Sequence, residues 1–268
     1  MAALSLSRAW DQSRDVLRRD GQLLGSVALA LFVLPGVIGD MVTPSHPPGT
    51  MAPIGYWTAI SFFGLLIGLV GQLAIVRLAL GPRHSVGEAI RHGLRRLPAY
   101  LGASALWIFP FLIAVSLLLA QAPNPQKPPP GVALAILILL AGFAFVAVRL
   151  ILVVGVSSGE TGASPQVLRR SWDLSRGNVL RLLAFLLLVL VAFFVLVLAI
   201  SAVIGTIVRL TVGAIEPMSV SALLVSLAGQ LVAAGITTTL MVMLARIYAQ
   251  LSGHDASASG LPNVHHKD

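Results

Sequence analysis

Arginine is the residue type in this sequence with the clearest chemistry, because its planar guanidinium can bind a phosphate group through two parallel hydrogen bonds. Most of the arginines gather in three short polar segments that lie between long apolar stretches. We expect seven of them to contact lipid headgroups, where each basic residue near an anionic leaflet contributes about 1 kcal/mol. The simpler alternative is that they only fix the topology and anchor the chain to lipid in general. The seven are Arg8, Arg14, Arg91, Arg95, Arg169, Arg170 and Arg176.

Three further arginines recur near the ends of apolar stretches, in Val76-Arg77-Leu78, Val148-Arg149-Leu150 and Ala245-Arg246-Ile247. An arginine at the bilayer centre costs about 2.5–3.5 kcal/mol on insertion scales, whereas one near a helix end can extend its charge to the headgroups. The first interpretation is that each reaches the membrane surface separately. The alternative is a central cavity lined by Arg77, Arg149 and Arg246, which could hold a lipid phosphate.

Motifs for enzymatic chemistry are absent from the sequence. It contains no G-x-x-x-x-G-K-[ST], H-E-x-x-H or G-x-S-x-G pattern. The lack of cysteine excludes disulfides, thiolate metal sites and a cysteine nucleophile. The adjacent pair His265 and His266 is only weak evidence for a metal site. We therefore expect a non-enzymatic protein with no catalytic residue, no cofactor and no metal.

The composition excludes a soluble enzyme. The 268 residues are 57% hydrophobic and only 10% charged, with a mean hydropathy of +0.91. Soluble domains are usually about 45–50% apolar and about 25% charged. Because a single globule of this composition could not hide its apolar surface from water, we expect a membrane protein.

Six uncharged windows of 19 to 36 residues divide the chain, and a transmembrane helix needs about 20 apolar residues. No cleavage pattern of small residues follows the first window, so we expect a retained span there and no signal peptide. The sequence predicts an all-α polytopic membrane protein with six transmembrane helices in three hairpins. The expected spans are 21–40, 55–78, 98–120, 132–155, 180–208 and 219–248.

The basic residues lie almost entirely on one side of these spans. Sixteen of the 18 lysines and arginines share the side of the termini, and only Lys127 and Arg209 lie on the other. Since cytoplasmic loops are enriched in basic residues, we expect both termini in the cytoplasm. The formal charge of +8 and the pI near 11.2 therefore reflect topology, and we expect no nucleic-acid partner.

Two seven-residue segments share the pattern R-x-W-D-x-S-R, at 8–14 and 170–176, and each precedes a pair of spans. A weaker third copy starts at Ser85. We therefore expect a single transmembrane domain over residues 1–250, made of three pseudo-repeats at about 1–80, 81–160 and 161–250. Each hairpin would be preceded by a basic amphipathic helix that lies in the membrane interface. The polar segment 251–268 is expected to be a disordered tail.

Few polar side chains lie inside the expected spans. Gln72 and Gln230 are interpreted as packing contacts between helices. Asp40 is assigned to the edge of the first span, so we expect no acidic residue inside a span, which disfavours a proton- or sodium-coupled carrier. A face of small residues in the second span permits close helix packing, either within the fold or in a homo-oligomer. This face consists of Gly64, Gly68 and Gly71.

The stretch from Val148 to Leu182 resembles bacterial membrane proteins of the glycerophosphodiester phosphodiesterase membrane-domain type. The resemblance rests on Leu168-Arg169-Arg170-Ser171-Trp172-Asp173-Leu174-Ser175-Arg176-Gly177-Asn178, where that family shows an xRRSWxLTRGNxWRL run. Ser175 stands where threonine is usual, and Val179-Leu180 replace the bulky aromatic step. The resemblance implies a helical protein of the bacterial inner membrane. It does not transfer the phosphodiesterase activity, because the catalytic domain with its acidic metal ligands has no counterpart in this chain.

These observations favour a non-enzymatic inner-membrane protein that interacts with anionic phospholipid or supports an envelope complex. The alternative function is a transporter or permease-like component with the cavity of Arg77, Arg149 and Arg246. The expected partners are membrane phospholipids and, through the glycine face, a second copy of the chain.

Overall fold

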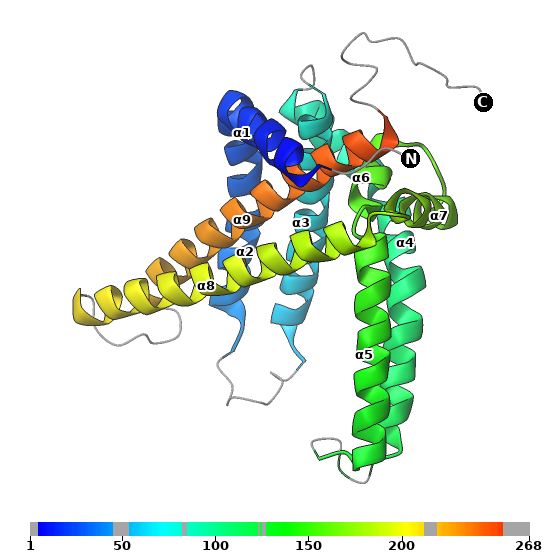
Figure 1. The fold of residues 1–268 in the computed structure, drawn as a ribbon. Helices are drawn as coiled ribbons and strands as arrows, with labels where there is room; N and C mark the ends of the chain where they lie inside the picture. Colours follow the sequence, from blue (N-terminus) through cyan, green and yellow to red (C-terminus); the bar gives the residue numbers. More distant parts are fainter. Residues whose placement is uncertain are drawn as a thin grey trace.

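The computed structural model describes residues 5–44, 54–81, 85–122, 124, 127–211 and 219–253. Over these residues the chain is helical and contains no strand (Figure 1). The expected tail 251–268 lies outside the described residues from 254 onward, as do His265 and His266. The elements are α1 (Leu6–Ala28), a π-helical turn η1 (Leu29–Val33), α2 (Leu34–Val42), α3 (Tyr56–Leu80), α4 (Val86–Ala120), α5 (Pro130–Leu150), α6 (Val153–Gly159), α7 (Ser164–Ser175), α8 (Val179–Thr211) and α9 (Val220–Ser252).

Six helical runs are long and apolar enough to cross a membrane, which confirms the prediction of an all-α polytopic membrane protein. Each run covers most or all of one expected span. The first and third runs begin earlier than expected, because they also include the basic segments that precede the spans. The runs are Leu6–Val42, Tyr56–Leu80, Val86–Ala120, Pro130–Gly159, Val179–Val208 and Val220–Ser252.

The sequence predicts three separate basic surface helices, and in the structure only one of the three basic segments is a separate helix. The first is continuous with its span through α1, η1 and α2, and the second is the beginning of α4. Only the third forms a helix of its own, α7, which ends just before Gly177 in the left-handed conformation (φ 80°). Glycine adopts this conformation without a Cβ penalty, so it stops α7 where the other two helices continue.

The two copies of the R-x-W-D-x-S-R segment bury equivalent positions. Ala9 and Ser13 in α1 are fully buried, and so are the matching Ser171 and Ser175 in α7. The arginines at both ends of each segment are exposed. Both segments thus pack one face against the protein and present their arginines outward, as an amphipathic helix does.

The buried core lies at one end of the helices. It is formed mainly by residues 9–27 of α1, 73–79 of α3, 148–156 of α5 and α6, and 241–248 of α9. The helix α3 is central, since it contacts α1, α2, α4, α6 and α9. We call this the basic end, because Arg77, Arg149 and Arg246 lie in these stretches. The side chain of Gln250 also contacts Ser5 and Gln12 there, at 3.4 and 3.3 Å, so the start of α1 lies beside the end of α9.

Serine hydroxyls join the helices at the basic end. Ser158 Oγ donates to the carbonyl oxygen of Leu73 at 2.9 Å, and Ser164 Oγ donates to that of Ala99 at 3.1 Å. These bonds fasten α6 to α3 and the start of α7 to α4. The short segments between the spans are thereby held against the core.

Away from the basic end, large apolar side chains are exposed. Ile138, Leu188 and Phe194, for example, are 63–70% exposed. Such a surface would be unfavourable in water but suits a bilayer, where helices satisfy their own backbone hydrogen bonds. Figure 1 shows α4 and α5 side by side, with α8 and α9 as a second pair that runs obliquely to the first.

Candidate functional site

Three of the arginines singled out in the sequence line one pocket of about 290 Å³ at the basic end. We call it the basic pocket. Arg77 comes from α3, and the other lining residues come from α4. The pocket therefore joins two arginines of the expected headgroup set with one arginine of the expected cavity set. Its lining residues are Arg77, Glu88, Arg91, His92 and Arg95.

The first turns of α4 position two arginines of the basic pocket. Ser85 caps the helix: its Oγ accepts from the backbone N–H of Glu88 at 3.3 Å. Glu88 Oε2 in turn accepts from the backbone N–H of Ser85 at 3.0 Å, which completes a capping box. Arg91 and Arg95 follow, four residues apart, and side chains at this spacing lie on one face of a helix.

Gly93 brings α4 close to α3. A Cβ added at Gly93 would lie 2.8 Å from the carbonyl oxygen of Val70 and 3.3 Å from its side chain. A residue with a side chain would therefore separate the two helices. Arg77 lies seven residues after Val70, which is close to two turns, so it shares the face of α3 that α4 covers.

The basic pocket carries an excess of positive charge. Three guanidiniums face one carboxylate, that of Glu88, which leaves a formal charge of +2 with His92 neutral. His92 Nε2 lies 3.0 Å from the carbonyl oxygen of Ser158, and since a carbonyl only accepts, the ring donates there. Within the described part of the chain, the three arginines form no hydrogen bond or ion pair. Arg91 and Arg95 are exposed, and Arg77 is half-buried.

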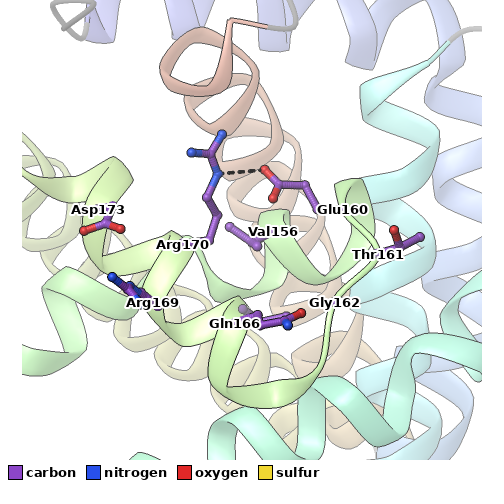
Figure 2. A pocket seen from close by; sticks show the side chains of 9 residues that line it. Val156, Glu160, Thr161, Gly162, Gln166, Arg169, Arg170 and Asp173 are labelled. Carbon is purple, nitrogen blue, oxygen red and sulfur yellow. Dashed lines mark hydrogen bonds and ion pairs between the residues drawn. The ribbon is translucent and has the colours of Figure 1, made fainter.

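A second pocket of about 290 Å³, between α6 and α7, contains Arg169 and Arg170 (Figure 2). Figure 2 shows Arg170 reaching from α7 to Glu160, where its Nε donates to Oε1 at 3.0 Å. The hydroxyl of Tyr248 donates to the same oxygen, also at 3.0 Å. Glu160 and Asp173 balance the two arginines, so this pocket has no net formal charge. Its contacts join α6, α7 and α9 and leave little charge for an anion.

The other arginines of the expected headgroup set lie on exposed surfaces. Arg8 and Arg14 are exposed on α1. Arg176, after the end of α7, is exposed and lies 3.6 Å from a carboxylate oxygen of Asp173. An exposed ion pair of this kind contributes about 0–1 kcal/mol. These arginines suit general attraction to an anionic surface rather than a defined site.

The three arginines of the expected central cavity share one local pattern. Each is half-buried between two buried neighbours, as Arg77 is between Val76 and Leu78. Their further surroundings differ, however. The guanidinium of Arg149 lies over two aromatic rings, 5.5 Å from that of Phe145 and 4.8 Å from that of Trp172.

This stacking leaves part of Arg149 without hydrogen bonds. Its Nε and NH1 atoms are buried and have no partner among the described residues. The attraction between a cation and the face of an aromatic ring, about 0.5–2 kcal/mol, replaces part of the lost hydration. Neither Arg149 nor Arg246 is among the residues that line the basic pocket around Arg77.

A larger cavity of about 370 Å³ lies between η1, α2, α3 and α9. We call it the polar cavity. Asp40 lies two residues before the end of α2 with an exposed side chain, which agrees with its assignment to the edge of the first span. Its Oδ2 accepts from Ser226 Oγ at 2.7 Å and from Gln230 Nε2 at 2.9 Å. The polar residues that line the cavity are Asp40, Thr43, Ser61, Gln72, Gln230 and Thr237.

Sequence reasoning missed this cavity, although it found several of its residues. It treated Gln72 and Gln230 as separate packing contacts, and the structure places both on one cavity wall. One signal was available. Asp40 is the only charged residue between Asp20 and Arg77, so it interrupts an otherwise uncharged stretch that contains two spans.

The glycine face of α3 packs within the chain. A Cβ at Gly64 would lie 3.5 Å from Pro35, and a Cβ at Gly71 would lie 2.7 Å from the ring of Phe32. Gly68 also lies close to Phe32. These contacts give the glycines a role inside one molecule, and homo-oligomerisation through Gly64, Gly68 and Gly71 stays a prediction.

Within the described residues, no three His, Cys, Asp or Glu side chains are grouped to hold a metal ion. No family model, curated protein or solved structure matches the chain. The resemblance to the glycerophosphodiester phosphodiesterase membrane-domain family stays a prediction that rests on the segment around residues 168–178.

Proposed function

We propose that this chain is a non-enzymatic protein of the bacterial inner membrane that binds anionic phospholipid at its basic end, with both termini in the cytoplasm. The observation that carries the proposal is the basic pocket, in which Arg77, Arg91 and Arg95 outnumber the single carboxylate, Glu88, and form no ion pair with a described residue. The orientation rests on the distribution of basic residues between the two sides of the spans.

The charge and size of the basic pocket suit a lipid phosphate. A formal charge of +2 complements a phosphodiester, and guanidiniums bind phosphate oxygens in pairs. The volume of about 290 Å³ lies at the lower end of the range of small-molecule sites, about 300–1,000 Å³. This space suits a headgroup better than a large soluble ligand.

The surroundings of the basic pocket fit a position at the membrane boundary. Leu94 lies between Arg91 and Arg95 in the sequence and is 61% exposed. An exposed leucine beside two exposed arginines is favourable where acyl chains and headgroups meet. A phosphate in the pocket could therefore belong to a lipid whose acyl chains lie along the apolar sides of α3 and α4.

The test compares two triple variants of equal charge. Arg77→Gln, Arg91→Gln and Arg95→Gln remove the basic pocket, whereas Arg8→Gln, Arg14→Gln and Arg176→Gln remove three arginines outside it. Phosphatidylglycerol retained by the purified proteins is counted by native mass spectrometry, and helicity is checked by circular dichroism. Hydrogen bonds to charged groups contribute about 1.5–3 kcal/mol each, so the pocket variant should retain at least about tenfold less lipid than the wild type.

The control variant should stay within about threefold of the wild type, because exposed arginines act mainly through screened surface attraction. If both triple variants lose lipid equally, the arginines attract lipid only in general and the basic pocket is not a binding site. A third variant, Arg149→Gln with Arg246→Gln, tests the permease-like alternative. If the three arginines lined one cavity, this double variant would reduce phosphatidylglycerol retention as strongly as the loss of Arg77. We expect its retention to be unchanged.

A further inference from the structure

The polar cavity contains an acidic group near the end of the first helical run. Asp40 lies in α2, and its partners Ser226 and Gln230 lie one turn apart on α9. The lining extends along α3 from Ser61 to Gln72, which is 16 residues into that helix. At 1.5 Å per residue, Gln72 therefore lies about 24 Å along α3 from its start, well within the span.

Among the described residues, no cation forms an ion pair with Asp40. Both of its hydrogen-bond donors bind Oδ2, and Oδ1 has no hydrogen bond or ion pair with any described residue. No arginine, lysine or histidine is among the residues that line the cavity. An acidic group on the wall of a cavity between transmembrane helices usually marks the path or site of an ion.

The walls of the cavity indicate which kind of cation it suits. Divalent metal ions prefer several carboxylate or carbonyl ligands at short distances, and this cavity has a single carboxylate. Its volume of about 370 Å³ also exceeds the space that a bare ion requires. Leu31, Phe32 and Pro35 also line the cavity and supply apolar surface beside the amide and hydroxyl groups. An aromatic ring, a carboxylate and apolar contacts are the groups that bind ammonium ions with an organic substituent.

The helix beside the cavity is irregular at the same place. The π-helical turn η1 contributes Leu31 and Phe32 to the wall, and Pro35 follows directly. Proline has no N–H to donate to the carbonyl of Leu31, four residues earlier, and its ring collides with that carbonyl in a regular helix. The π-turn absorbs this conflict, and such turns in α-helices occur frequently at functional sites.

We propose that the polar cavity binds a small organic ammonium ion, with Asp40 as its counter-charge. Ser226 and Gln230 hold one carboxylate oxygen of Asp40 and leave the other oxygen for the ligand. The ammonium group could belong to a free amine or to the headgroup of phosphatidylethanolamine. This inference is independent of the basic pocket and of the lipid proposal.

The experiment measures binding of radiolabelled choline to the purified full chain in detergent, with and without added phosphatidylethanolamine. The wild type should bind choline saturably, and Asp40→Asn should weaken binding at least about tenfold, which corresponds to about 1.4 kcal/mol. Asp20→Asn, which removes a carboxylate that is paired with Arg19, is the matched control and should bind as the wild type does. Asparagine at position 40 can still accept from Ser226, so we expect this variant to fold.

Two competitors define the ligand class. Tetramethylammonium should displace choline, whereas 3,3-dimethyl-1-butanol, a neutral molecule of the same shape, should not. Displacement of choline by phosphatidylethanolamine would identify the headgroup as the source of the ammonium, and binding that the lipid leaves unchanged would identify a free amine. Absence of saturable binding, equal binding to Asp40→Asn, or equal competition by the neutral molecule or by sodium would each overturn the proposal.

Discussion

The basic pocket and the polar cavity have similar volumes, about 290 and 370 Å³, but their charged groups are brought together in different ways. In the basic pocket, Arg91 and Arg95 are neighbours on one helix. In the polar cavity, Asp40 meets partners that are 186 and 190 residues away in the sequence. Cations at the membrane boundary can gather on one short segment, because headgroups and water solvate them there. The carboxylate that lines the cavity has partners that only the tertiary structure supplies.

The two sites also depend on different helix contacts. The basic pocket requires Gly93 of α4 against α3, and the polar cavity requires Gly36 of α2 against α9. Each contact can be disturbed by one substitution, so lipid retention and ammonium binding should be separable. Three predictions test this separation, in order of the expected effect.

The largest effect is expected for Gly93→Leu. The new side chain would collide with the backbone carbonyl of Val70, which can give way only if α4 moves from α3. Overpacking of this kind typically costs about 1–3 kcal/mol. We expect a lower Tm and loss of retained phosphatidylglycerol, with choline binding unchanged in the folded fraction. Gly87→Leu on the same helix meets no atom within 4 Å and should behave as the wild type. If Gly93→Leu and Gly87→Leu retain the same amount of phosphatidylglycerol, the α3–α4 contact at Gly93 does not form the lipid site.

A smaller effect on stability but a clear effect on binding is expected for Gly36→Leu. A side chain there meets the end of the Gln230 side chain, which is flexible and can move aside. The displaced amide would lose its bond to Asp40, and the leucine would occupy part of the cavity. Choline binding should fall at least about tenfold, whereas phosphatidylglycerol retention should not change. Gly25→Leu in the same helical run has open space around it and serves as the control. A loss of lipid retention in Gly36→Leu would show that the two sites are coupled.

The smallest effect is expected for Ser226→Ala. It removes one of the two hydrogen bonds to Asp40 and leaves the charge in place. Interhelical hydrogen bonds in membranes contribute about 0.6 kcal/mol on average, so choline binding should weaken about threefold. Ser116→Ala, whose hydroxyl bonds only within α4, is the control and should have no effect. A loss as large as that of Asp40→Asn would mean that Ser226 contacts the ligand itself.

The sequence predicted the spans well because hydropathy is a local property. Six uncharged windows gave six helical runs, and the basic segments lie at the buried end of the helices. The sequence did not reveal that α1 and α4 continue from these segments into their spans. Gly177 ends α7 because it adopts the left-handed conformation, whereas Gly21 and Gly25 stay helical and α1 continues. The sequence alone does not show which of these conformations a glycine adopts.

The candidate sites were predicted only in part. Arg91 and Arg95 were identified by their helical spacing, but their meeting with Arg77 depends on the close approach at Gly93. Asp40 was assigned to the edge of the first span, but its partners Ser226 and Gln230 are too distant in the sequence to be predicted. Arg149 was expected to reach the membrane surface, with a shared arginine cavity as the alternative, and its stacking on Trp172 arises from the contact between α5 and α7.

The π-turn at Leu29–Val33 has a consequence for how the first helical run could change during evolution. A π-turn behaves as one extra residue in an α-helix, so everything after it is rotated by about 100° relative to a regular helix. The π-turn therefore determines the angle between the basic face of α1 and the face of α2 that carries Asp40, although both faces belong to one continuous helical run. A change that restored a regular helix at constant chain length would leave the arginines in place and rotate Asp40 away from α9, whereas deletion of one residue at the turn would keep Asp40 facing α9. The acidic site therefore depends on the match between the π-turn and the length of the chain, and not only on its own residues.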